Sequence, residues 1–95
     1  MAGISRVYDQ IAKFAKKHDV QRVVLFGSRA RGDAEEKSDI DIAISGCSDF
    51  PAFEDDVQEK LWSLLEVDIV NLDGNVSPEL LANIKRDGKV IYEAL

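Results

Sequence analysis

Residues 23–32, Val-Val-Leu-Phe-Gly-Ser-Arg-Ala-Arg-Gly, form the stretch that decides the expected fold. Four apolar residues, two of them β-branched, stop at Gly27 and Ser28, which predicts a buried strand running straight into a tight turn. Glycine at 27 would let the backbone approach a ligand, and the amides after it, near the start of a short helix, would point at an anion. Ser28 could add a hydroxyl donor, and Arg29 and Arg31 could bring positive charge to a polyphosphate. Taken alone, however, an ordinary surface turn is the simpler interpretation.

Hydrophobic periodicity on both sides of this turn predicts the rest of the fold. The expected order is helix, strand, turn with a short helix, strand, helix, strand, helix, strand, an α/β (α+β) arrangement in a single domain over residues 1–95. The predicted elements are an amphipathic helix over residues 4–17, a strand over 38–44, an amphipathic helix over 53–65, a strand over 67–72, a helix between Ser77 and Gly88, and a short strand over 90–92.

The composition sets limits on the class of protein. Of 95 residues, 45% are hydrophobic and 32% are charged, which is typical of a globular domain. The sequence predicts no membrane span and no leader segment, so we expect a cytoplasmic protein. One cysteine and one histidine are too few for a zinc site. The net charge of -6 disfavours a long nucleic acid as ligand, whereas a single nucleotide with its own magnesium remains compatible.

Two aspartates lie on one face of the second predicted strand. Strict alternation places Ile40, Ile42 and Ile44 on one side and Asp39 and Asp41 on the other. Two carboxylates so close would repel one another unless a hard cation lay between them. The alternative interpretation is a pair of solvated aspartates on an edge strand, although aspartate is depleted in strands generally.

A third aspartate, Asp68, lies between Val67 and Ile69 in a strand that we expect to be largely buried. An isolated ionised carboxylate costs several kcal/mol in such a place, so Asp68 should lie at an exposed strand end or serve a function. Beside the turn, three aspartates could form a two-metal site in which Asp39 and Asp41 bridge the ions. Asp68 could help to bind the ion that activates an acceptor hydroxyl, and could accept that hydroxyl's proton.

Other polar and aromatic residues are given structural interpretations. His18 is expected to be a helix-end residue without a partner, and Cys47 an unreactive small residue. Trp62 and Phe14 fall within helical apolar patterns and are predicted to pack in the core. The acidic run at residues 54–56, with Glu59 one turn on, is predicted to be a solvated helix face. Docking of a basic partner is the less favoured alternative.

Three segments together resemble a known signature. Residues 27–32 (GSRARG), 38–41 (SDID) and 67–70 (VDIV) are similar to the motifs of the polymerase β-like nucleotidyltransferase superfamily, above all its minimal branch, the MNT or MntA-like proteins. The resemblance extends from the first helix to Tyr92, without departure at the motif positions. The resemblance implies a small mixed sheet flanked by helices. It also implies ATP and two Mg²⁺ ions as cofactors. Carried over residue by residue, it implies that Gly27 and Ser28 hold phosphate, that Arg29 or Arg31 assists, and that Asp39, Asp41 and Asp68 bind metal.

The resemblance also implies a partner and an activity. In that family the minimal transferase is the antitoxin of a two-gene module, type VII, and neutralises a HEPN toxin by transferring AMP to a tyrosine. We therefore expect an ATP-dependent protein adenylyltransferase that forms a hetero-oligomer with a HEPN partner. One alternative is a binding module that masks the toxin without chemistry, which the three carboxylates disfavour. Another is transfer to a small molecule, which the absence of a further lobe disfavours.

Overall fold

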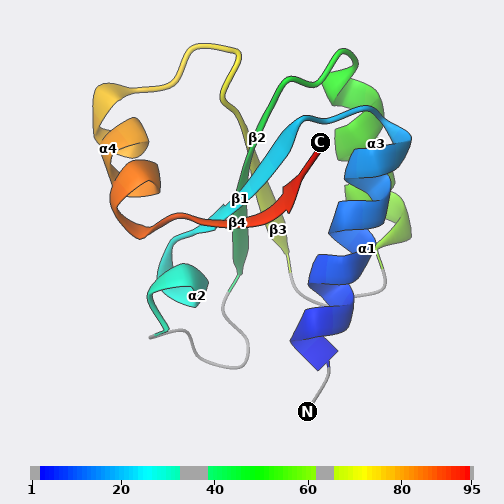
Figure 1. The fold of residues 1–95 in the computed structure, drawn as a ribbon, viewed down its shortest axis with the longest axis horizontal. Coiled ribbons are helices and arrows are strands. Elements are labelled where there is room, and N and C mark those ends of the chain that lie inside the picture. The colour runs from blue at the N-terminus through cyan, green and yellow to red at the C-terminus, as the bar shows by residue number, and fades with distance from the viewer. Residues whose placement is uncertain (1–2, 33–38, 62–65, 95) are drawn as a thin grey trace.

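The computed structural model describes residues 3–32, 39–61 and 66–94, and shows four helices and four strands in the predicted order (Figure 1). The elements are, along the chain, α1 (Gly3–Lys17), β1 (Arg22–Phe26), α2 (Ser28–Arg31), β2 (Ile40–Ser45), α3 (Phe50–Lys60), β3 (Val67–Asn71), α4 (Pro78–Asp87) and β4 (Lys89–Glu93).

The four strands form one mixed sheet in the order β3-β2-β1-β4. Strand β1 is antiparallel to both β2 and β4, whereas β2 and β3 are parallel. The mixed sheet implied by the family resemblance is therefore confirmed. Because β2 is an interior strand, the alternative that placed Asp39 and Asp41 on an edge strand is wrong.

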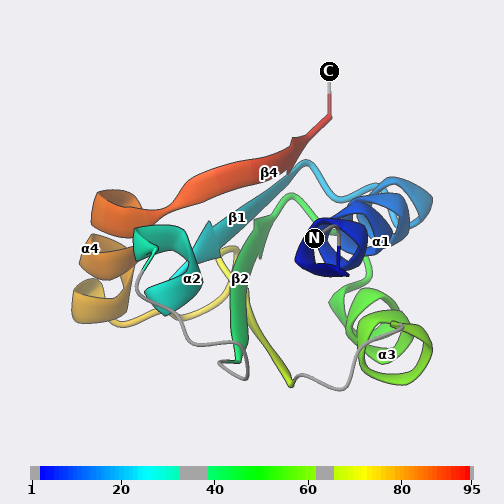
Figure 2. The ribbon, with the colours of Figure 1, turned by 90° about the horizontal axis from the view of Figure 1, so that it is seen from below.

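The two faces of the sheet are covered by different helices, α1 and α3 on one side and α2 and α4 on the other (Figure 2). The larger apolar core lies under α1 and α3, where Ile40, Ile42 and Ile44 are fully buried, as their alternation predicts. A smaller cluster on the α4 side consists of Phe26, Ala43 and Ile84. Residues on β2 whose numbers are odd therefore face α2 and α4.

Helices α3 and α4 each begin directly after a residue whose side chain caps the helix. Asp49 Oδ1 accepts a hydrogen bond from the Ala52 amide at 3.2 Å. Helix α3 therefore starts at Phe50, three residues before the predicted start at Phe53. It ends at Lys60 because Leu61 is extended, with ψ of 126°, so the prediction that the helix continues to residue 65 is wrong at Leu61. The predicted core position of Trp62 lies outside the described residues. Ser77 caps α4 as expected, since its Oγ accepts from the Leu80 amide at 3.2 Å.

Helices α1 and α3 are joined through Asp56, which is only 7% exposed. His18 Nε2 lies 2.5 Å and Lys17 Nζ 3.0 Å from Asp56 Oδ2, while Lys60 Nζ lies 2.9 Å from Oδ1. Hydrogen bonds from His18 and then from the two lysines hold the pKa of Asp56 well below its usual value. Two predictions are corrected here: His18 has a partner, and Asp56 is not part of a solvated face.

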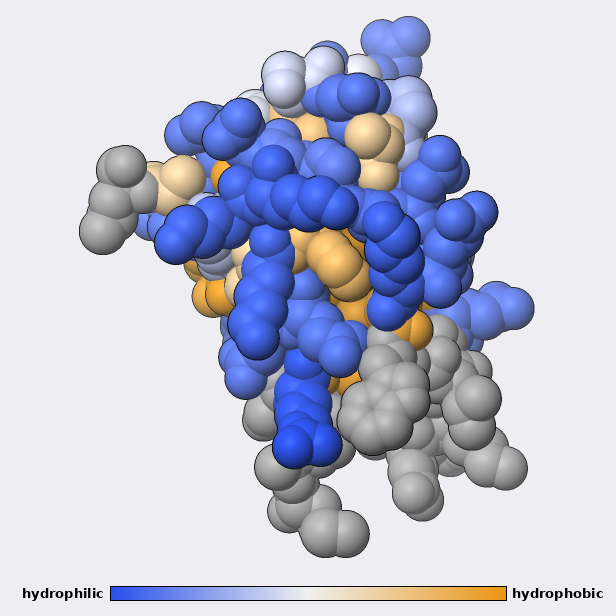
Figure 3. All heavy atoms as spheres, turned by 90° about the vertical axis from the view of Figure 1, so that its right-hand side faces the viewer, coloured by the Kyte–Doolittle hydropathy of each residue, from blue (hydrophilic) through white to orange (hydrophobic). Residues whose placement is uncertain are grey.

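The outward side of α1 and α3 is mainly hydrophilic (Figure 3). Its exposed residues on α1 are Arg6, Asp9, Lys13, Lys16 and Lys17. Within the described residues, no helix combines the length and apolar character that crossing a membrane requires.

Candidate active site

The turn after β1 has the sharp geometry that its sequence predicts. Gly27 has φ of 76°, in the region that side chains disfavour, and is the N-cap of the four-residue helix α2. The amides of Ala30 and Arg31 both donate to the Gly27 carbonyl at 3.1 Å. Gly32 closes the helix in the left-handed conformation, and its amide donates to the Ser28 carbonyl. The strand therefore leads directly into a tight helical turn.

Gly27 lies against the carboxylate of Asp41. A Cβ atom at position 27 would stand 2.5 Å from Asp41 Oδ2, closer than real Cβ contacts come. The close approach follows from the register, because Phe26 at the end of β1 pairs with Asp41 on β2. Glycine is thus required at 27 both for its φ and for the space that the carboxylate occupies.

The parallel pairing of β2 and β3 places Asp41 directly beside Asp68. Neighbours in register share a face of the sheet, so both side chains lie on the side of α2 and α4. Asp39 precedes β2 by one residue and is exposed, and its charge reaches Asp41. The structure therefore brings the three predicted aspartates to one end of the sheet, next to the Gly27 turn.

The pKa of Asp41 is raised above its usual value of 3.8. Partial burial is the largest cause, followed by the charge of Asp68 and a hydrogen bond with it, and then by the charge of Asp39; Arg31 opposes the shift. Three like charges here destabilise the ionised form of Asp41. A positive charge from outside the chain would relieve that repulsion.

The expectation of a largely buried third strand is wrong. Strand β3 lies at the edge of the sheet, and although Val67 is buried, Asp68 is exposed. An exposed carboxylate carries no large desolvation cost, so burial does not mark Asp68 as functional. Its position in register with Asp41 is what distinguishes it.

The two arginines of the turn lie in different surroundings. Arg31 is close enough to Asp41 to lower its pKa, and its Nη1 lies 3.4 Å from Asp87 Oδ2 on α4. Arg29 instead faces Tyr8 on α1, where burial raises the pKa of the Tyr8 hydroxyl and the charge of Arg29 opposes that rise. Sequence analysis missed Tyr8 and Asp87, because nothing in the pattern connects α1 or the end of α4 with the turn.

Carboxylate oxygens are the ligands that Mg²⁺ prefers, and the set Asp39, Asp41 and Asp68 fits such an ion chemically. Across the described residues, no three His, Cys, Asp or Glu side chains come close enough to enclose a metal by themselves. Mg²⁺ does not need an all-protein cage, because it commonly keeps several waters and binds one or two carboxylates together with substrate phosphates. The adjacent pair Asp41 and Asp68 offers such an open half-site.

A glycine turn packed against paired carboxylates, on one end of a mixed sheet, is suited to binding phosphate together with a divalent cation. The family described as "Polymerase beta, Nucleotidyltransferase" matches residues 9–94, which include the turn and all three aspartates. The chain belongs to this nucleotidyltransferase family.

Individual relatives agree with this assignment. A candidate protein adenylyltransferase of Methanocaldococcus jannaschii is 58% identical over 31 residues, which are 33% of this chain and 31% of that protein. One chain of a toxin-antitoxin complex crystallised with AMP-PNP is 29% identical, with a TM-score of 0.72, over 92% of this chain and 73% of that one. One chain of a complex between tri-AMPylated Shewanella oneidensis HEPN toxin and MNT antitoxin is 26% identical, with a TM-score of 0.66, over 95% of this chain and 72% of that one.

Proposed function

We propose that this protein is a Mg²⁺-dependent adenylyltransferase that moves AMP from ATP to a hydroxyl of a partner HEPN toxin and so acts as its antitoxin. The observation that carries the proposal is the placement of Asp41 between Asp68 and the backbone of Gly27. The carboxylates of Asp41 and Asp68 repel one another, and they lie beside a turn that is suited to phosphate. A nucleotide that brought its own metal ion would complete such a site. The predicted cytoplasmic location, where ATP is available, belongs to the same proposal.

The turn would hold the triphosphate. The amides of Ala30 and Arg31 already donate to the Gly27 carbonyl, so the amide of Ser28, at the start of α2, would meet a phosphate oxygen. Ser28 would add its hydroxyl, and Arg31 its charge, because Arg31 already acts on Asp41 electrostatically. Arg29 lies on the Tyr8 side of α2 and is not assigned to the triphosphate.

The three aspartates would divide the remaining work. Asp39 and Asp41 would hold Mg²⁺ together with the nucleotide phosphates, and Asp68, the neighbour of Asp41, would help to hold the ion on the side that faces the acceptor. Magnesium, when bound, neutralises charge on the phosphates and stabilises the oxygens that attack and leave. The acceptor oxygen forms a bond to the α-phosphorus, the bond from that phosphorus to the bridging oxygen breaks, and pyrophosphate leaves. Asp68 accepts the proton of the attacking hydroxyl.

The partner is inferred from the relatives and from the exposure of Asp68. Two similar solved chains come from toxin-antitoxin complexes, and one of these contains an AMPylated HEPN toxin. Asp68 is exposed on the edge strand β3, where a protein side chain can reach it. A tyrosine hydroxyl presented by a second polypeptide therefore suits the open side of the site.

The test is to mix the purified protein with ATP, Mg²⁺ and the HEPN protein encoded beside it, and to measure the mass of that partner. We expect the partner to gain AMP units at a tyrosine, only when Mg²⁺ is present. Binding of the partner without any gain of mass would reject the transferase in favour of a masking module. Repeating the assay with an aminoglycoside in place of the partner tests small-molecule transfer, for which we expect no product.

A further inference from the structure

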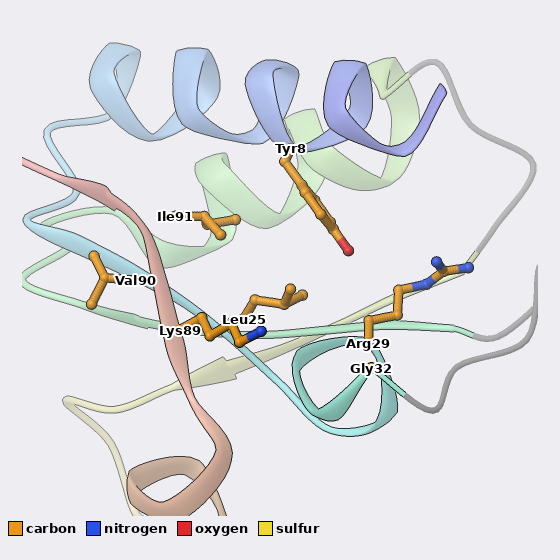
Figure 4. Close-up of a pocket in the computed structure, with 7 residues that line it drawn as sticks. All are labelled: Tyr8, Leu25, Arg29, Gly32, Lys89, Val90 and Ile91. Atoms are coloured by element: carbon orange, nitrogen blue, oxygen red, sulfur yellow. The ribbon is translucent and has the colours of Figure 1, made fainter. Parts of the chain in front are cut away.

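A pocket of about 520 Å³ opens on the α1 side of the sheet, whereas Asp41 and Asp68 lie on the side of α2 and α4. Its walls come from four elements, with Tyr8 on α1, Leu25 on β1, Arg29 on α2, and residues 89–91 on β4 (Figure 4). The volume lies within the range of small-molecule sites. The pocket is separate from the aspartates because Leu25, which forms part of its wall, faces the α1 side of the sheet.

The polar groups of this pocket favour an anion. Arg29 and Lys89 bring two positive charges to it, in a chain whose net charge is -6. Figure 4 shows the Tyr8 ring extending from α1 toward Arg29, and the charge of Arg29 opposes the rise that burial causes in the pKa of the Tyr8 hydroxyl. Among the described residues, no carboxylate pairs with the Lys89 ammonium. Arginine and lysine together are typical ligands of phosphate.

The remaining walls favour a flat apolar group beside that anion. Leu25 and Ile91 lie along the pocket between Tyr8 and Lys89 (Figure 4). Val90 is 54% exposed and is the large hydrophobic residue left uncovered in the described chain. A ligand that brought an aromatic base against these side chains would cover apolar surface while its phosphate met the Lys89 ammonium.

We propose that this pocket binds an adenylate group, a phosphate with its adenosine, independently of the metal site. The group has two chemically equivalent sources, free AMP or the AMP already attached to the acceptor; the second source rests on the proposed function. Helix α2 carries Arg31 toward the aspartates and Arg29 toward the pocket, and four helical residues span only about 6 Å. A group that leaves the reaction centre is therefore close to the pocket.

Binding of free AMP tests the pocket without any transfer reaction. In EDTA, so that no divalent cation is present, we expect calorimetry to detect AMP binding that is weakened about tenfold by Lys89→Gln, as loss of a charge-assisted contact predicts. Arg29→Gln should weaken it as well, and adenosine or inorganic phosphate should bind more weakly than AMP. The matched control is Lys85→Gln, an exposed lysine on α4 outside the pocket, which should leave binding unchanged. Absence of AMP binding, or equal binding by Lys89→Gln, overturns the proposal.

The number of AMP units transferred distinguishes the two sources. If the pocket holds AMP attached to the acceptor, Lys89→Gln should add the first unit at the normal rate and later units several times more slowly. If later units are added normally while free AMP binding is lost, the ligand is free AMP. If the wild-type protein transfers nothing, the proposed function fails, whereas the calorimetric result with AMP still decides the pocket.

Discussion

Two acidic centres, on opposite sides of the sheet, differ in the charges that surround their carboxylates. Asp56, between α1 and α3, is buried among His18, Lys17 and Lys60, and its pKa is lowered. Asp41, on the other side, is half-buried beside Asp68, and its pKa is raised. The chain surrounds Asp56 with positive charges, whereas at Asp41 the charges of Asp68 and Asp39 outweigh that of Arg31.

The difference teaches which carboxylate serves the fold and which serves a ligand. A buried carboxylate with partners in the protein stabilises the native state, whereas carboxylates that repel one another cost stability. The repulsion between Asp41 and Asp68 lowers the stability of the fold, and it occurs next to a turn that requires glycine. Such an arrangement indicates a site that an external cation completes. Breaking each centre in turn should therefore have opposite effects.

The largest effect is expected on activity. Asp41→Asn keeps the shape of the side chain but removes the charge that would hold the metal, so AMP transfer should fall at least about a thousandfold. Initial rates of AMP incorporation into the partner measure it. Asp55→Asn, an exposed acid on α3, has the same change of charge and should keep the normal rate. A D41N protein with more than a tenth of the normal rate would contradict the metal assignment.

The next effect is a loss of stability at the other centre. Asp56→Asn leaves Lys17, His18 and Lys60 without their shared carboxylate, and should lower the melting temperature by several degrees. Because the folded pKa of Asp56 is depressed, its contribution is present above the usual carboxyl pKa and is lost as the pH falls. Thermal unfolding followed by circular dichroism checks this, with Asp55→Asn as the control. Equal melting of the two variants at pH 7 would show that the buried cluster adds nothing.

A smaller stabilisation is expected from magnesium. At a free concentration about threefold above its dissociation constant, Mg²⁺ should stabilise the wild-type protein by about 0.8 kcal/mol. The double variant Asp41→Asn with Asp68→Asn should show no such gain, because the half-site is gone. Differential scanning calorimetry with and without Mg²⁺ measures both proteins. If Mg²⁺ stabilised the double variant as much as the wild type, the ion would bind at a site other than Asp41 and Asp68.

The smallest effect is a gain in stability without metal. Since the folded pKa of Asp41 is raised, the folded protein binds its proton more tightly than the unfolded chain, and stability falls as the pH rises through that window. Asp41→Asn should therefore be more stable than wild type at pH 7, by about 0.5 kcal/mol or less at this half-exposed position. The difference should vanish below the usual pKa of 3.8. Urea titrations at pH 7 and pH 3 in EDTA measure the free energy of unfolding of both proteins. A variant that is less stable than wild type at pH 7 would contradict this prediction.

The features that the sequence predicted correctly are local in the chain. Alternation along β2 placed Ile42 and Asp41 on opposite faces, because side-chain direction in a strand has a period of two. The stop of β1 at Gly27 and the cap at Ser77 also depend on neighbouring residues alone. The order of elements and the candidate site could therefore be inferred before any contact was known.

The features that sequence analysis missed depend on contacts between distant segments. Exposure of Asp68 depends on β3 being an edge strand, which its own apolar neighbours do not reveal. The contact between His18 and Asp56 joins residues 38 positions apart. The direction of Arg29 toward Tyr8 depends on how α1 packs across the sheet, which periodicity does not specify.

The most direct test of the contrast is a carboxyl NMR titration of all aspartates, with and without Mg²⁺. Without the ion, the pKa of Asp41 should lie above 3.8 and that of Asp56 well below it. Addition of Mg²⁺ should lower the pKa of Asp41 and leave that of Asp56 unchanged, because only Asp41 has neighbouring carboxylates whose repulsion a cation can relieve. An Asp41 carboxyl that titrates at the usual pKa and ignores Mg²⁺ would contradict the proposed metal-dependent site.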